Sequence, residues 1–160
     1  MNAPLSEYLR SSVPAAHSLV FDMFCACALD VAAELRVPAY SFQCRAASHL
    51  AVILHLPQMQ ARINASFGEI GNKPLSLPGV PSFKPSDLPR EALDRDDEMY
   101  KWVLRAFERL PESRGILVNT FEWLETKALR ALRNGACFVG RPTPPVCCVG
   151  PLVSRGGERY

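Results

Sequence analysis

The stretch LVFDMFC, residues 19–25, decides the fold class of this chain. Its large apolar residues run on continuously instead of alternating with polar ones. Such a run predicts a strand with both faces covered, which is typical of a parallel sheet. Asp22 interrupts the run. A buried carboxylate is costly without a partner, so Asp22 either caps an exposed strand end or serves as an acid at the carboxyl end of a strand.

Three further apolar runs predict strands near residues 38–43, 115–119 and 146–149. Helical periodicity follows each of the first three runs, and one more helix, with Trp102 and Phe107 on its apolar stripe, precedes the run at 115–119. We interpret the aromatic residues of that stripe as core. This alternation predicts an α/β fold, a Rossmann-like parallel sheet with flanking helices. Ligands of such sheets bind beyond the carboxyl ends of the strands, where Asp22 is expected.

Prolines mark the remaining boundaries. Pro57 predicts a kink or a restart in the helix that follows residues 38–43. The segment from Gly68 to Arg90 contains five prolines, and we expect neither a regular helix nor a central strand there. A long irregular segment inside a compact domain is usually functional or disordered. Its apolar residues are expected to hold it on the surface: Leu75, Leu77, Val80 and Phe83.

Composition narrows the function classes. The chain has 160 residues, 48% hydrophobic and 21% charged, which is typical of one globular domain. A net charge of +2 gives no electrostatic case for nucleic acid or an anionic membrane, and no apolar run is long enough to span a bilayer. The six cysteines lack zinc-site spacing. We therefore expect no metal, reduced thiols and a cytoplasmic location.

Five segments, in this order, resemble the amino-terminal domain of plant UDP-dependent glycosyltransferases that glucosylate flavonoids and other small phenolics. They are LVFDMFC (19–25), ALDVAAELRVPAY (28–40), LPGVPSFKPSDLP (77–89), GILVNTFEWLETKAL (115–129) and PVCCVGPL (145–152). The resemblance implies a GT-B fold with a sheet that follows chain order. Residues 1–160 are then expected to form an incomplete amino-terminal, acceptor-binding half-domain. The first strands and the carboxyl-terminal UDP-sugar domain are expected to be absent.

The family reaction is an inverting transfer of a sugar, such as glucose, from a UDP-sugar to a phenolic hydroxyl, with the UDP-sugar as co-substrate and no cofactor. The resemblance implies that Asp22 is the partner of a catalytic histidine. That histidine would lie upstream of Met1, because none of the three histidines in the chain matches its position: His17, His49 and His55. Phe24 would face the acceptor, with plain core as its alternative. Cys44 takes the place of a threonine that contacts the donor sugar, and a thiol substitutes poorly for a hydroxyl.

Two hypotheses remain. The first is a partial glycosyltransferase that binds a phenolic acceptor and is inactive alone. The second is a non-catalytic small-molecule-binding or interaction module derived from the same fold. An unrelated dinucleotide enzyme is disfavoured, since no G-x-G-x-x-G follows a strand.

Without a preceding strand, the run at 19–24 would form an open sheet edge, which predicts self-association. Arg36 stands where the family has glycine, at a position suited to a left-handed helix terminus.

Overall fold

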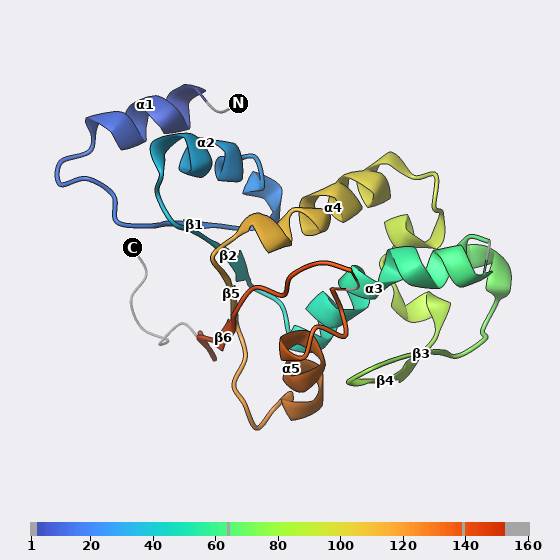
Figure 1. Cartoon of the computed structure of the whole chain (residues 1–160). Coiled ribbons are helices and arrows are strands. Elements are labelled where there is room, and N and C mark those ends of the chain that lie inside the picture. The colour runs from blue at the N-terminus through green and yellow to red at the C-terminus, as the bar shows by residue number, and fades with distance from the viewer. Residues whose placement is uncertain (1–2, 64, 139, 153–160) are drawn as a thin grey trace, which may run out of the picture.

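The computed structural model describes residues 3–63, 65–138 and 140–152. A parallel sheet in the order β1-β2-β5-β6 forms its centre, and an antiparallel pair, β3 and β4, lies apart from it beside α3 (Figure 1). The strands are β1 (Leu19–Phe21), β2 (Ala39–Gln43), β3 (Leu75–Leu77), β4 (Val80–Phe83), β5 (Gly115–Val118) and β6 (Val146–Cys148). The α-helices are α1 (Ala3–Ser11), α2 (Ala28–Leu35), α3 (Ala47–Ile63), α4 (Glu98–Glu108) and α5 (Thr126–Arg133). The 3₁₀ turns are η1 (Met23–Cys25), η2 (Phe67–Ile70), η3 (Pro85–Asp87), η4 (Arg90–Leu93) and η5 (Leu110–Glu112).

The predicted sheet is confirmed. All four strands form where the apolar runs lie, every neighbouring pair is parallel, and the order of the strands follows the chain. Leu19 pairs with Ala39, and Ser41 pairs with Ile116. Parallel strands joined through helices make an α/β fold, so the expected class is correct.

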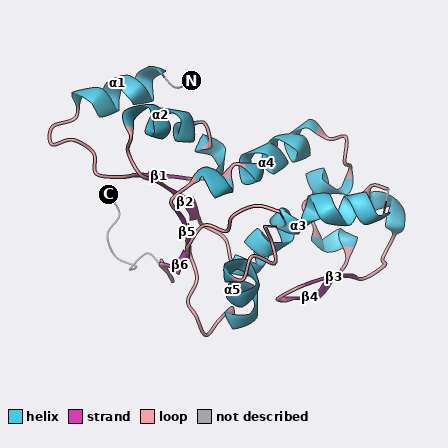
Figure 2. Cartoon of the chain, viewed as in Figure 1, coloured by secondary structure: helices cyan, strands magenta, loops and turns pink. Residues whose placement is uncertain are grey.

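Among the residues that the structure describes, the sheet is covered on one face only. Each connection moves toward the same edge, and right-handed crossovers then place every connecting helix on the same side. Figure 2 shows α3, α4 and α5 together beside the sheet, and Ala28, Leu29 and Ala32 of α2 pack with Phe21 of β1. Phe21, Ile116 and Val118 are buried against that side, whereas the side chain of Val20 on the other face is 55% exposed. The prediction that the first strand is covered on both faces is therefore wrong for the described residues. The expected open edge is present, since β1 ends the sheet; self-association through it stays a prediction.

The proline-rich middle contains more structure than its sequence predicts. β3 and β4 form a hairpin whose turn lies against α5. Leu75 and Leu77 are buried in the main core, so these apolar residues hold the segment against the domain as expected. Gly79 has φ +81°, and a Cβ there would lie 2.6 Å from the Lys127 carbonyl oxygen. Only glycine fits so close an approach. The expected restart at Pro57 is also wrong, because α3 runs through this residue.

The first turn of α3 is held by a carboxylate from a distant part of the chain. The two oxygens of Glu125 accept the backbone N–H groups of Ala47 and Ser48 at 2.7 and 2.9 Å, and one also accepts the Ser48 hydroxyl at 2.6 Å. These N–H groups have no partner within the helix, so the contact satisfies both. Partial burial acts to raise the pKa of Glu125, but the hydrogen bonds from Ser48 and Ala47 outweigh it and lower the pKa below its usual value.

Arg36 ends α2 in the left-handed region, with φ 56° and ψ 34°. The expectation for this position is confirmed. Its backbone N–H still closes the helix end on the carbonyl groups of Ala32 and Ala33. A side chain with a Cβ is strained in this conformation, whereas glycine is not.

Replacing Arg36 by glycine should therefore stabilise the chain by about 1 kcal/mol. The measurement is the free energy of unfolding in urea. Arg36→Ala is the matched control, because it removes the same side chain and keeps the Cβ. A stability gain of equal size in both variants would contradict the strain argument and assign the effect to the side chain.

Replacing Glu125 by glutamine should cost about 1–2 kcal/mol of stability at pH 7, as for the loss of a helix N-cap. Because folding lowers the pKa of Glu125, its contribution is complete above the unfolded value of 4.5 and is lost as the pH falls through the folded value. Stability measured between pH 6 and about pH 3 should thus fall less steeply in the variant than in the parent. Glu91→Gln, at an exposed residue, is the control and should match the parent across the range.

Candidate functional site

The carboxyl edge of the sheet gathers the polar residues that follow the strands. Asp22 follows β1, Cys44 follows β2 and Asn119 follows β5. These strands are neighbours in the sheet. A crevice beyond the carboxyl ends of parallel strands is the usual ligand position in such folds, and this edge is the candidate site.

Asp22 both caps a turn and exposes its carboxylate. Its Oδ1 accepts the backbone N–H of Phe24 at 2.9 Å and so begins the 3₁₀ turn η1. The side chain is exposed at the sheet edge. Burial, followed by the charge and hydrogen bonding of Asp22, raises the pKa of the neighbouring Cys25 thiol. The two interpretations of Asp22 from sequence are therefore compatible: a turn cap leaves its carboxylate fixed and accessible.

Phe24 lies on the surface next to Asp22 and stacks on Trp102 of α4. The ring centroids are 5.7 Å apart and the ring planes differ by 22°. Phe24 is 62% exposed and Trp102 is 37% exposed. The core alternative for Phe24 is therefore wrong, and so is the interpretation of Trp102 as core, although Phe107 on the same helix is buried. The two stacked rings form an exposed apolar patch beside a carboxylate, which suits an aromatic ligand with a hydroxyl group.

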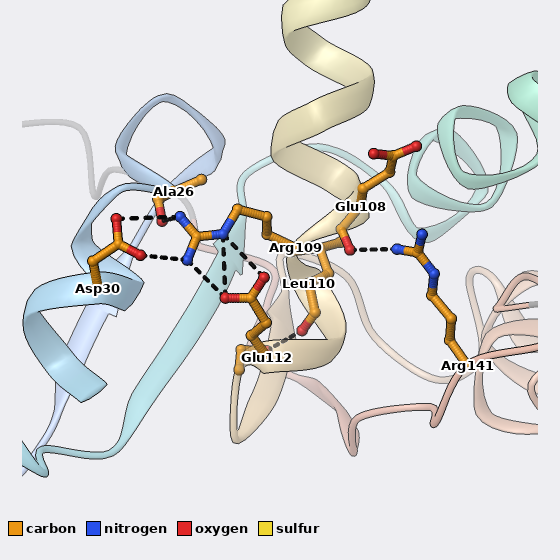
Figure 3. A network of polar contacts seen from close by, with 8 residues as sticks. Ala26, Asp30, Glu108, Arg109, Leu110, Glu112 and Arg141 are labelled. Carbon is orange, nitrogen blue, oxygen red and sulfur yellow. Dashed lines mark hydrogen bonds and ion pairs between the residues drawn. The ribbon is translucent and has the colours of Figure 1, made fainter. Parts of the chain in front are cut away.

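Arg109, at the end of α4, contacts the end of the turn η1 that Asp22 begins. Its guanidinium donates to the Ala26 carbonyl oxygen at 3.2 Å, to Asp30 at 2.7 Å and to Glu112 at 2.7 Å (Figure 3). The hydrogen bonds to Glu112 and Asp30 raise the pKa of Arg109, so its charge is permanent. Stacking at Trp102 and ion pairing at Arg109 together fix the segment that carries Asp22 against α4.

Cys44 is exposed beyond β2 and is held through its backbone. Its carbonyl oxygen accepts the Asn119 side-chain amide at 3.3 Å, and the Asn119 Oδ1 accepts the Leu152 N–H at 2.8 Å. Asn119 thus joins the ends of two strands to the segment that follows β6. The thiol of Cys44 is free.

The amino terminus of α3 points at the same edge but is already occupied. A helix amino terminus is a ready site for phosphate, and here the carboxylate of Glu125 fills it. Burial, and then the charge of Arg45, lower the pKa of His49 on this helix. His17 lies in the exposed loop before β1, and His55 is buried with a ring nitrogen 2.9 Å from the Ala51 carbonyl oxygen.

The described residues contain neither a cluster for a metal ion nor a helix for a membrane. Within residues 3–63, 65–138 and 140–152, no group of three or more histidine, cysteine, aspartate or glutamate side chains is arranged to hold a metal ion. In the same part of the chain, none of the helices combines the length and the apolar character needed to cross a membrane.

Sequence reasoning missed three residues of this site: Trp102, Arg109 and Asn119. Trp102 and Arg109 are seven positions apart on α4, and this spacing places them on the same helix face, two turns apart. That spacing was available in the sequence. The partner on the other side was not, since it required knowing that α4 crosses the turn after β1.

No family model matches the chain. Among curated proteins it is 40% identical over 148 residues to an anthocyanidin 5,3-O-glucosyltransferase of a Rosa hybrid cultivar, covering 92% of this chain and 30% of that protein. It is 42% identical over 141 residues to UDP-glycosyltransferase 72B1 of Arabidopsis thaliana, covering 88% and 28%. The structure of Phytolacca americana UGT2 with UDP-2fluoro-glucose and pterostilbene superposes with a TM-score of 0.85 at 29% identity, covering 99% of this chain and 34% of that one.

These similarities extend over almost the whole chain, yet the chain spans only about a third of the length of the proteins that it matches. Sequence identity of this level together with a matching fold excludes a chance resemblance. The chain belongs to the plant UDP-glycosyltransferase family.

Proposed function

We propose that this chain is the acceptor-side part of a plant UDP-glycosyltransferase that transfers a sugar, such as glucose, to a hydroxyl of a small phenolic compound. The observation that carries the proposal is the exposed carboxylate of Asp22 next to the stacked rings of Phe24 and Trp102. The rings offer a surface for an aromatic acceptor, and an exposed acid next to them supports a role in activating the reacting hydroxyl. A planar aromatic acceptor fits both features.

The relatives support the same substrate class. One is named for glucosylation of anthocyanidins, and the Phytolacca americana structure contains a UDP-sugar analogue together with pterostilbene. Both names refer to those longer proteins. For this chain we infer a phenolic acceptor and a UDP-sugar donor, with the donor bound mainly by residues outside the described part.

In the proposed reaction Asp22 acts through a histidine base. The histidine takes the proton of the acceptor hydroxyl, the acceptor oxygen bonds to the anomeric carbon, and the bond from that carbon to the UDP oxygen breaks with inversion. A carboxylate hydrogen-bonded to the other ring nitrogen fixes the tautomer and stabilises the imidazolium that forms. Asp22 suits this role because η1 holds its carboxylate in one position at the carboxyl end of β1.

We propose that residues 1–160 form an incomplete amino-terminal domain. Two features of the described residues support this. The edge of β1 is open, and one sheet face is uncovered, with Val20 55% exposed. All-parallel sheets occur almost only with both faces covered, so further strands and helices would complete the sheet. A second domain would bind the UDP-sugar.

The non-catalytic alternative is favoured by one observation. Cys44 and Arg45 are exposed where the family usually has a threonine-containing stretch at the donor sugar. A thiol donates a weak hydrogen bond, and an arginine adds bulk and charge. In that case the surface that binds the phenolic compound would remain while sugar transfer is lost.

The six cysteines of the chain are free thiols, which supports a reducing compartment such as the cytoplasm for either function.

Binding of a flavonoid should be visible through Trp102 in the chain as it stands. Trp123→Phe removes the second of two tryptophans and leaves Trp102 as the only fluorophore of its kind. We expect a flavonoid to quench Trp102. Adding Phe24→Ala should weaken binding about threefold to tenfold, the range for an aromatic pair.

Two controls belong to this titration. Phe121→Ala removes another surface phenylalanine, 38% exposed, and should leave the affinity unchanged. Trp102→Phe keeps only Trp123, which is 90% exposed, and its emission should not respond. Equal affinities for the Phe24→Ala and Phe121→Ala variants would contradict the proposed acceptor surface.

The role of Asp22 is tested in an enzyme made whole with the missing segments of a relative. The isolated chain should transfer no glucose, and the completed enzyme should. Asp22→Asn should lower kcat by about tenfold to a thousandfold, since it removes support from a general base. Asp96→Asn, at an exposed acid of the same chain, serves as the control. Full turnover by the Asp22 variant would disprove the assignment, whereas inactivity of every completed form would favour the non-catalytic alternative.

A further inference from the structure

A small cavity lies between α3, α4 and the segment after α5, away from the candidate site. Its volume is about 140 Å³, and its wall includes Ile53, Leu54, Pro57, Leu104, Phe107 and Phe138. α4 ends at Glu108, shortly before β5 begins at Gly115. Arg109, directly after α4, contacts the turn after β1. Asp22, Phe24 and Trp102 are not among the residues that line the cavity.

The wall is mainly apolar and aromatic, and one of its residues has a backbone carbonyl group without its usual helical donor. Pro57 has no N–H, so the carbonyl group of Ile53, four residues earlier, lacks its normal helical donor. Both residues line the cavity. A backbone carbonyl without its donor favours a ligand that brings an O–H or N–H group.

A hydrogen bond joins two of the segments that form the cavity, and the charged side chains that line it carry no net charge. Arg141 donates to the Glu108 carbonyl oxygen at 2.7 Å and ties the segment after α5 to α4 (Figure 3). Gln58, Glu108 and Arg141 are also lining residues, so one acidic and one basic side chain offset each other's charge. Cys137 also lines the cavity, and burial raises the pKa of its thiol to about 11, which keeps this wall neutral.

We propose that this cavity binds a neutral, single-ring aromatic molecule that carries a hydroxyl or an amine, as phenol does. Size sets the class: a cavity of about 150 Å³ lined by leucine, isoleucine and phenylalanine holds one benzene ring. Sites for drug-sized ligands occupy about 300–1,000 Å³. A three-ring flavonoid is too large. The site is therefore separate from the acceptor surface at Phe24 and Trp102 in position and in the size of its ligand.

The test is a titration of the whole chain with phenol, followed by NMR of the protein methyl groups. We expect a Kd on the order of 1 mM, with shifts at Ile53, Leu54 and Leu104. Leu104→Phe and Leu54→Phe each fill the cavity from a different helix and should weaken binding by at least about tenfold. Leu124→Phe, the same change at a side chain 65% exposed elsewhere, is the matched control and should bind phenol as the parent does.

Three results would overturn the proposal: parent affinity in both filling variants, methyl shifts that fall outside the cavity, or displacement of phenol by a three-ring flavonoid. The methyl shifts are read in the parent chain, so the test holds even where a filling variant fails to fold. Trp102→Phe keeps the cavity and alters the acceptor surface. Undiminished phenol binding by this variant supports the separate site. Loss of binding would be a fourth contradicting result, because it would assign phenol to the acceptor surface.

Discussion

The contact between the Glu125 carboxylate and the first turn of α3 organises much of this structure. Glu125 comes from the segment after β5, whereas α3 follows β2. The contact therefore locks two strand-to-helix connections together at the carboxyl edge. α3 is the longest helix of the described residues and packs against α4, α5 and the β3–β4 hairpin through the main core. Its direction sets the layer that covers the sheet.

The same contact has a chemical consequence. An anion of the protein occupies the helix terminus at which a nucleotide phosphate would otherwise bind. The edge presents the rings of Phe24 and Trp102 next to the exposed carboxylate of Asp22, which suits a phenol better than a diphosphate. This agrees with the division of labour that we propose, in which this domain holds the acceptor and another part of the enzyme holds the nucleotide. α4 positions the residues of the proposed acceptor surface, since Trp102 and Arg109 contact the turn that follows Asp22 at two points.

The sequence predicted the sheet well because each strand is a compact apolar run, and burial of such runs dominates over other local preferences. It predicted Asp22 at the carboxyl edge for the same reason. It failed where the answer depends on a distant partner. Periodicity identified the apolar stripe of α4 but could not show that Trp102 faces Phe24 at the surface. Five prolines suggested an irregular segment, yet Pro81 lies within β4, because the strand of a two-stranded hairpin has an edge that needs no N–H donor.

The coincidence of strand order with chain order also bears on how the domain assembles. Leu19 pairs with Ala39, twenty positions along the chain, whereas Ser41 pairs with Ile116, seventy-five positions along. Loop closure costs about 0.6 kcal/mol more for each doubling of length, so joining β5 to β2 is the entropically hardest step. Glu125 makes its contact to α3 across the same gap. The first βα unit can form early during synthesis, but the sheet closes only after the ribosome has released the segment that contains Glu125.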